Sequence, residues 1–219
     1  MAAPSSDLAG WLRAGHTLGR GCFRAENVAR DGGRTLLALP VGTFDGGQIA
    51  SPERYARGRF HARLRTADAP GSVTAFFLYE DVPGEANDEA DVEIFNDGSG
   101  RALLTTWRHG VQTRSEDVRL GFDPSAAAHD YAIELDAAEI RFLVDEALLA
   151  RWSDGLPTRP MRVMASAWWP SWLRGPAPAD TRYSTIEQIS IDAEPARTGA
   201  ERWRITAATP HLLLDGKLG

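Results

Sequence analysis

The chain has 219 residues, of which 43% are hydrophobic and 25% are charged, and its formal net charge is −6. This composition is typical of a globular domain whose core is large enough to need neither disulfides nor a structural metal. Its lone cysteine excludes an intrachain disulfide, and the acidic balance argues against nucleic acid and anionic membranes as partners, because both require a basic surface.

The two ends of the chain carry few structural signals. The first residues lack the basic region and the apolar stretch of a secretory signal, and no apolar run is long enough for a membrane-spanning helix. We expect a secreted protein whose signal peptide is absent from this sequence, or a cytoplasmic one if Met1 is the native start. We divide the chain into an N-terminal segment (1–19), one main domain (20–195) and a C-terminal tail or edge strand (196–219), and we expect a monomer.

Between the ends, short apolar runs alternate with turn residues, among 21 glycines and 13 prolines in all. Their patterns predict strands over 36–39, 59–65, 72–79, 91–95, 101–107, 117–122, 131–135, 140–144, 162–167 and 185–191. Asn96-Asp97-Gly98 predicts a hairpin turn, because these residues tolerate positive φ. We expect at most one helical turn, over 125–131, and a long irregular loop over 170–180. The pattern favours an all-β fold, a sandwich or jelly roll of two antiparallel sheets.

The segment Glu89-Ala90-Asp91-Val92-Glu93 carries the strongest chemical signal. In a strand, its three carboxylates point to one face and the apolar residues to the other, so the acids face a groove or solvent. The Cα atoms of Glu89 and Glu93 then lie about 13 Å apart, and inward-leaning side chains approach the ~5–5.5 Å carboxyl separation of a retaining glycosidase. A solvated strand and a calcium-binding patch are the alternative interpretations.

At these residues the chain resembles glycoside hydrolase family 16, whose members carry Glu-x-Asp-x-Glu on one strand of a β-jelly roll with two curved antiparallel sheets, the concanavalin A-like lectin/glucanase fold. The resemblance covers about residues 20 to 194 and implies that 20–195 is a catalytic domain. It implies Glu89 as nucleophile, Asp91 as assisting acid and Glu93 as general acid/base of a double displacement. The strand lacks the extra residue that bulges the laminarinase-like motif, and it shares this unbulged spacing with licheninases and with xyloglucan-active members of the family. Of these, the resemblance favours a licheninase-like endo-β-glucanase that acts on mixed-linkage 1,3-1,4-β-glucan.

The same resemblance implies a set of sugar contacts around the acids. The positions concerned are Arg20, Gln48, Asn87, Thr105, Trp107, Trp168 and Trp172. Flat aromatic faces suit pyranose rings, although each tryptophan could equally anchor a loop or fill the core, as we expect for Trp169. Licheninases resemble one another in having Trp, Glu and Asn where this chain has Asn87, Gln48 and Thr105, and Asn where it has Arg20. A guanidinium at position 20 would also suit an acidic or sulfated sugar.

No nucleotide-binding or metal-binding motif stands out, and we expect no cofactor. Members of the family often bind one structural calcium ion on the convex side of the sandwich, using an Asp near the last strand. Glu187 stands at that place here, which leaves the ion doubtful. The expected partner is a polysaccharide. Two other functions stay open: a non-catalytic, lectin-like carbohydrate-binding jelly roll, and a transglycosylase or hydrolase that acts on another β-linked or acidic polysaccharide.

Overall fold

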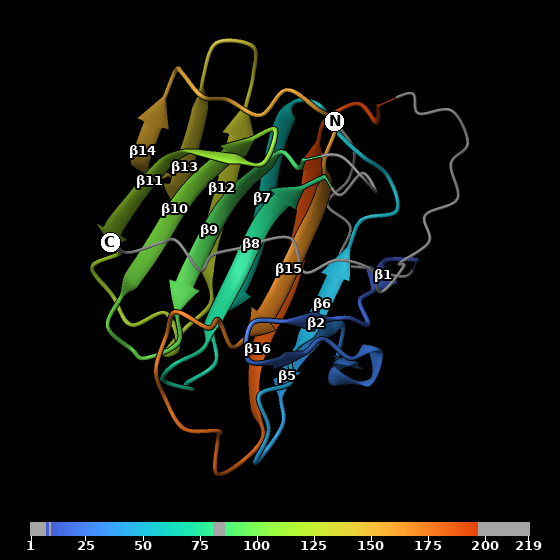
Figure 1. The fold of residues 1–219 in the computed structure, drawn as a ribbon, viewed down its shortest axis with the longest axis vertical. Coiled ribbons are helices and arrows are strands. Elements are labelled where there is room, and N and C mark those ends of the chain that lie inside the picture. The colour runs from blue at the N-terminus through green and yellow to red at the C-terminus, as the bar shows by residue number, and fades with distance from the viewer. Residues whose placement is uncertain (1–7, 9, 81–85, 197–219) are drawn as a thin grey trace.

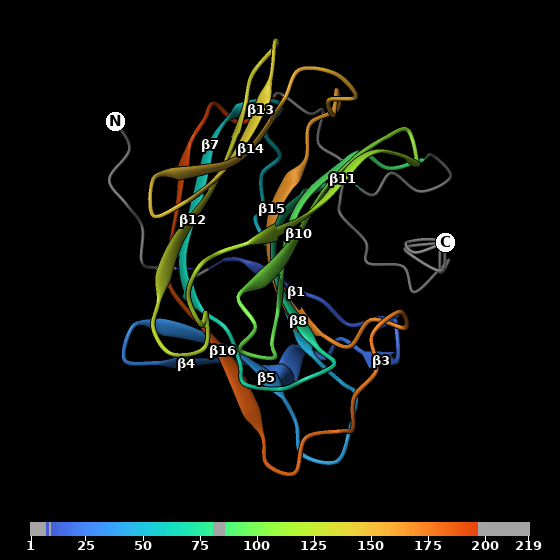
Figure 2. The same ribbon diagram turned by 90° about the vertical axis from the view of Figure 1, so that its left-hand side faces the viewer.

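The computed structural model describes residues 8, 10–80 and 86–196. The edge strand suggested for the C-terminal tail lies outside these residues. Two large antiparallel sheets pack face to face, as Figures 1 and 2 show, and the expected all-β sandwich is confirmed. In the described part of the chain, no helix is long and apolar enough to cross a membrane.

The front sheet holds the acidic segment at its centre. Its strand order is β1 (Leu12–Arg13), β6 (Gly47–Ala50), β15 (Arg162–Trp168), β8 (Val73–Tyr79), β9 (Glu89–Phe95), β10 (Arg101–Arg108) and β11 (Val111–Arg119). The β2–β3 hairpin (Thr17–Leu18 and Gly21–Cys22) and a 3-10 turn, η1 (Ala25–Asn27), lie between β1 and β6 in the chain. Strand β9 therefore pairs on both sides, with β8 and β10.

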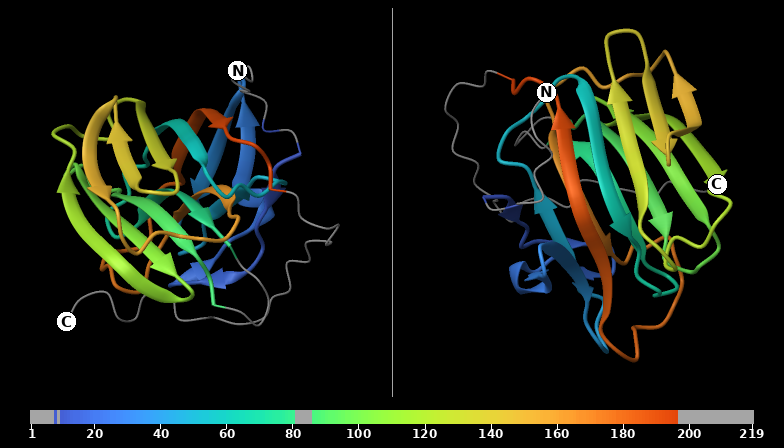
Figure 3. Two further views of the ribbon diagram at one scale, coloured as in Figure 1. Left: turned by 90° about the horizontal axis from the view of Figure 1, so that it is seen from above. Right: turned by 180° about the vertical axis from the view of Figure 1, so that it is seen from behind.

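The back sheet covers the inner face of the front sheet. Its strand order is β14 (Ala147–Trp152), β13 (Ile140–Val144), β12 (His129–Leu135), β7 (Gly58–Arg65), β16 (Arg182–Asp192), β5 (Arg34–Leu39) and β4 (Val28–Asp31). Seen from behind in Figure 3, the long orange strand β16 lies between β7 and β5, with which it pairs.

The hydrophobic core lies between the two sheets. Strand β9 contributes Ala90, Val92 and Ile94 to it, and the back sheet contributes large aromatic side chains such as Phe60 and Phe142, all fully buried. Because alternate residues of β9 join this core, packing fixes the register of the strand and turns its odd-numbered acids to the opposite face of the sheet.

The elements that the sequence missed are mostly short or peripheral strands. The strand predicted over 117–122 instead runs from Val111 to Arg119. The prediction misplaced it because polar and apolar residues alternate only weakly in an edge strand that is exposed along most of its length. The helical turn predicted over 125–131 was wrong, since β12 begins at His129. The hairpin at 96–98 and the strand-free loop over 170–180 are confirmed. Strand β1, in the expected N-terminal segment, pairs with β6.

Candidate active site

The acid row, which we define as Glu89, Asp91 and Glu93, lies on the outer face of the front sheet. The residues between them on β9 belong to the core cluster, so the three carboxyl side chains point away from it. Each acid nonetheless keeps only 4–7% of its surface exposed. The alternation expected from sequence therefore places all three acids together on one face. The groove expected beside them stays a prediction.

The side chains that flank the acid row across the sheet are all neutral. Tyr79 and Trp107 flank Glu89, Phe77 and Thr105 flank Asp91, and Ala75 and Leu103 flank Glu93. Successive acids are separated by about 7 Å along the strand, close enough for their charges to interact strongly.

Two positions predicted to bind sugar contact the acid row itself. The Thr105 hydroxyl donates a hydrogen bond to Oδ2 of Asp91, its cross-strand partner. The side-chain amide of Asn87 donates to Oε2 of Glu89 at 3.3 Å. Both contacts orient a carboxylate, so the structure gives these two residues a part in shaping the acid row.

Asp88 is a residue whose importance sequence reasoning missed. It is fully buried, and its Oδ1 accepts a hydrogen bond from the backbone N–H of His109 at 2.7 Å. Its Oδ2 accepts from the N–H groups of Thr158 and Arg159, at 2.5 and 3.0 Å, and from the Thr158 hydroxyl at 3.1 Å. These bonds tie the start of β9 to the β10–β11 turn and to the segment before β15.

The charge of Asp88 is stabilised by these donors. Burial by itself raises the pKa of Asp88, but the amides of His109, Thr158 and Arg159 outweigh it and leave the pKa below its usual value. One sequence signal could have revealed this residue. Asp88 lies two residues before Ala90, so in an extended chain both side chains point to the core face of the sheet. A carboxylate on that face needs several hydrogen-bond donors.

The adjacent residues Trp168 and Trp169, of which only the first was expected to face the sugar, are both largely covered by the protein. Trp168 is 7% exposed, and a Cβ added to Gly19 would lie 2.9 Å from its ring, so the turn between β2 and β3 lies directly over it. Trp169 packs in the core with an edge-to-face contact to Phe44, as expected. The structure thus assigns Trp168 mainly to packing under the hairpin.

The loop over 170–180 carries the third tryptophan and is held by close backbone contacts. Trp172 is half-buried and meets Phe95 of β9 edge to face, with ring centroids 5.7 Å apart. Gly175 lies against the turn that precedes β8, so closely that an added Cβ would approach the Pro70 carbonyl oxygen to 2.2 Å. Glycine is therefore required where this loop meets the end of the front sheet.

Arg20 is engaged with the same loop. Its Nη2 donates to the Gly175 carbonyl at 2.9 Å, and its guanidinium lies 3.7 Å from the centre of the Phe44 ring. These contacts join the β2–β3 hairpin to the loop that bears Trp172. The structure thus shows Arg20 as a tether between two segments beside the front sheet.

Gln48 and Trp107 lie on the same outer face as the acid row. Gln48 on β6 is level with Glu93 across β15 and β8, through Ser166 and Ala75. Its buried amide oxygen has no hydrogen-bond partner among the described residues, and an amide oxygen accepts hydrogen bonds from hydroxyl groups. Trp107 is half-buried and directly flanks Glu89.

On the back sheet, the place of the doubtful calcium ion is held by arginines. Glu187 of β16 accepts from Nε of Arg63 at 3.1 Å, and Nε of Arg34 lies 3.9 Å from its other oxygen. Among the residues that the structure describes, no group of three His, Cys, Asp or Glu side chains could hold a metal ion. The residues at this place do not fit calcium, because guanidinium groups already neutralise the carboxylate.

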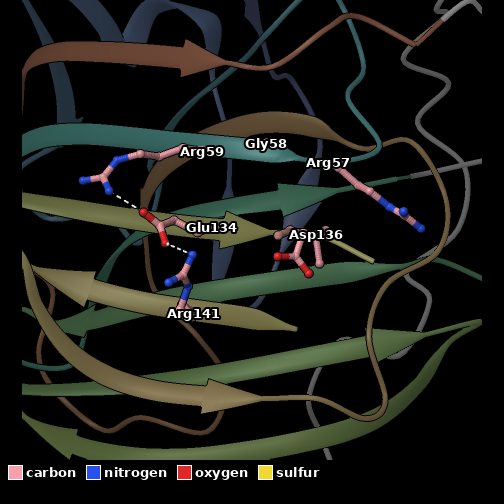
Figure 4. A pocket seen from close by; sticks show the side chains of 7 residues that line it. Arg57, Gly58, Arg59, Glu134, Asp136 and Arg141 are labelled. Carbon is pink, nitrogen blue, oxygen red and sulfur yellow. Dashed lines mark hydrogen bonds and ion pairs between the residues drawn. The ribbon is translucent and has the colours of Figure 1, made fainter. Parts of the chain in front are cut away.

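A hollow of about 400 Å³ also opens on the back sheet, far from the acid row in the fold. Its lining consists of Arg57, Gly58, Arg59, Glu134, Leu135, Asp136 and Arg141. We call it the charged pocket. Arg59 and Arg141 both pair with Glu134, as Figure 4 shows. Glu134 is paired with both arginines, and backbone N–H groups of Ala138 and Glu139 donate to Asp136 and lower its pKa, so neither carboxylate is poised to donate a proton.

Comparison with known proteins agrees with this arrangement. Residues 21–187 match the family model described as "Glycosyl hydrolases family 16". A Bacillus subtilis beta-glucanase is 30% identical over 151 residues, which cover 67% of this chain and 62% of the relative. A rice xyloglucan endotransglycosylase/hydrolase, protein 8, is 27% identical in an alignment that covers 99% of this chain and 82% of the relative. The chain thus spans less than two thirds of the length of the Bacillus relative.

A solved structure shows the same fold. A Bacillus licheniformis beta-glucanase superposes with a TM-score of 0.77 at 24% identity, covering 84% of this chain and 92% of the other. The likeness confirms the jelly-roll sandwich that the strand pattern predicts.

Proposed function

Because the chain belongs to the glycosyl hydrolases family 16, we propose that it hydrolyses the O-glycosidic bonds of a β-glucan, with net retention and endo action. The observation that carries this proposal is the acid row, three carboxyl groups on one outer strand face with only neutral cross-strand neighbours. A pair of carboxyl groups is what glycoside hydrolysis requires, one to donate a proton and one to act as nucleophile or base.

The chemistry follows from the positions of the three acids. Glu93 protonates the leaving glycosidic oxygen while an oxygen of Glu89 attacks the anomeric carbon, so that the C–O bond to the leaving sugar breaks as the glycosyl–enzyme ester forms. Glu93, now ionised, takes a proton from water, and the resulting attack releases the sugar and frees Glu89. Asp91 lies between the two and biases which of them holds the proton.

The proposed substrate is a mixed-linkage 1,3-1,4-β-glucan. Supporting it, the motif has the unbulged spacing, with no register shift along β9 in either pairing, and several relatives are named as beta-glucanases. Trp107 and Trp172 supply aromatic surface near the two ends of β9, and Gln48 supplies an acceptor for a sugar hydroxyl. Trp168 lies under the β2–β3 hairpin and Arg20 holds the Gly175 carbonyl, and their sugar contacts stay predictions.

Transglycosylation is the second candidate. The rice relative named for this activity aligns with 99% of the chain. Both reactions share the glycosyl–enzyme ester and differ only in whether water or a sugar hydroxyl takes the glycosyl group in the second step.

One assay tests all these alternatives. The purified protein is incubated with barley β-glucan, lichenan, laminarin, xyloglucan and agarose, and new reducing ends are measured with and without added oligosaccharide acceptors. We expect the highest rates on barley β-glucan and lichenan, and proton NMR of early products should show the β-anomer first. Transfer to xyloglucan acceptors without reducing-end release would favour the transglycosylase. If no polysaccharide yields new reducing ends but the protein binds to one of them in immobilised form, the protein is a carbohydrate-binding module and not an enzyme.

A further inference from the structure

Thr105 occupies an unusual position for a residue at a sugar-binding site. It stands directly opposite Asp91 on the neighbouring strand, and none of its surface is exposed. Its hydroxyl donates to Oδ2 of Asp91. A hydroxyl has a single proton to give, so the proton given to Asp91 is not available to a substrate oxygen. The geometry therefore directs Thr105 toward the acid row.

The hydrogen bond has two physical effects on Asp91. A donor aimed at a carboxylate favours its ionised form, and a β-branched side chain has few rotamers, so the carboxylate is also held in one orientation. Asn87 donates in the same sense to Glu89. Two anions held beside the last acid of the row favour the protonated form of that acid by like-charge repulsion.

We propose that Thr105 is a positioning residue, whose hydroxyl holds Asp91 as an oriented anion and thereby keeps the shared proton of the acid row on Glu93. The proposal rests on the proposed function, because a proton on Glu93 matters only if Glu93 protonates a leaving group. Thr105 itself touches no substrate and acts through Asp91.

Kinetics of two variants test this role. Thr105→Val removes the hydroxyl and keeps the branched shape, whereas Thr105→Ser keeps the hydroxyl and serves as the matched control. On the best glucan, we expect the valine variant to lose about tenfold in kcat with KM nearly unchanged, and its alkaline pH limb to move down by about one unit. The serine variant keeps the hydroxyl and loses only the branch, so its kcat and pH profile should lie much closer to wild type than those of the valine variant. Thermal melting of both variants corrects the rates for any loss of folded protein.

A substrate with an activated leaving group sharpens the test. A dinitrophenyl β-glycoside needs no proton from Glu93, because its leaving group departs as a stable anion. We expect the deficit of Thr105→Val to shrink severalfold on such a substrate. A raised KM with an unshifted pH profile and an equal deficit on both substrates would overturn the proposal and make Thr105 a sugar contact.

A measurement without substrate separates this proposal from the proposed function. The carboxyl carbons of ¹³C-labelled aspartates are followed by NMR against pH, with the Asp91 signal assigned by its loss in Asp91→Asn. In Thr105→Val, Asp91 should ionise at higher pH than in the wild type. An unchanged titration overturns the role of Thr105 whatever the enzyme cleaves, whereas a shifted titration in a protein that cleaves no glycan overturns only the proposed function.

Discussion

The outer faces of the two sheets both carry charged side chains, arranged in opposite ways. On the back sheet, charges of opposite sign face each other across strands: Arg59 pairs in register with Glu134, and Glu134 with Arg141. On the front sheet, the acid row faces only neutral cross-strand neighbours. Both patterns arise from the same two-residue period, so alternation alone does not distinguish a stabilising charge network from a reactive one. The cross-strand partner decides it.

The largest expected effect comes from neutralising the ends of the acid row. Glu89→Gln and Glu93→Gln should each lower kcat on the best glucan by at least about 10³-fold, because one removes the nucleophile and the other the proton donor. Reducing-end assays on folded protein measure this. The matched control is Glu134→Gln, the same change in the charged pocket, which should keep the wild-type rate. Equal losses in all three variants would contradict the assignment of the acid row.

A smaller effect, on stability, is expected at the residue that anchors the acid row. Asp88→Asn replaces a buried carboxylate that accepts from several donors, and should lower the free energy of unfolding by about 2–3 kcal/mol at pH 7. Chemical denaturation checks this value.

The pH dependence of that effect has a definite sign. The pKa of Asp88 is lowered in the folded state, since the donor amides outweigh burial, so the anion contributes stability above the unfolded pKa of about 3.9. This contribution is lost as the pH falls through the folded value. The stability gap between wild type and Asp88→Asn should therefore narrow below about pH 4. A gap that stays constant from pH 7 to pH 3 would show that the charge of Asp88 does not matter.

The smallest effect belongs to the charged pocket. Glu134 bridges two partly exposed arginines, so Glu134→Gln should cost about 1 kcal/mol of stability, and less at high salt. Denaturation at low and high ionic strength measures this. A loss of several kcal/mol, independent of salt, would mean that the pocket is a structural centre and would remove the contrast with the front sheet.

Much of the fold could be predicted because the residue types along most strands follow a local pattern of burial. The central strands β8, β9 and β10, the hairpin at 96–98 and the loop over 170–180 all follow from residue patterns within a few positions. The strands missed were short or lay at sheet edges, as β11 and β14 do, where one face is not buried and the pattern is weak. A local period reports burial, and these edge strands bury little, whereas β6 is buried throughout but has only four residues, too few to show a period.

The individual site residues divide in the same way. The shared face of Glu89, Asp91 and Glu93 follows from their spacing. The contacts of Thr105 with Asp91, and of Arg20 with Gly175, join positions 14 and 155 residues apart in the sequence. Which strand lies beside which, and in what register, depends on turns and on packing across the whole sheet.

The sequence by itself determined that this chain forms a sandwich and turns three acids to one face of one strand, because side-chain direction along a strand is a local property. Only the tertiary structure decided which side chains hold those acids, that Asp88 is a buried anchor, and that Trp168 lies beneath a hairpin. Those facts depend on contacts between strands, and a contact between distant residues is set by the packing of both sheets together.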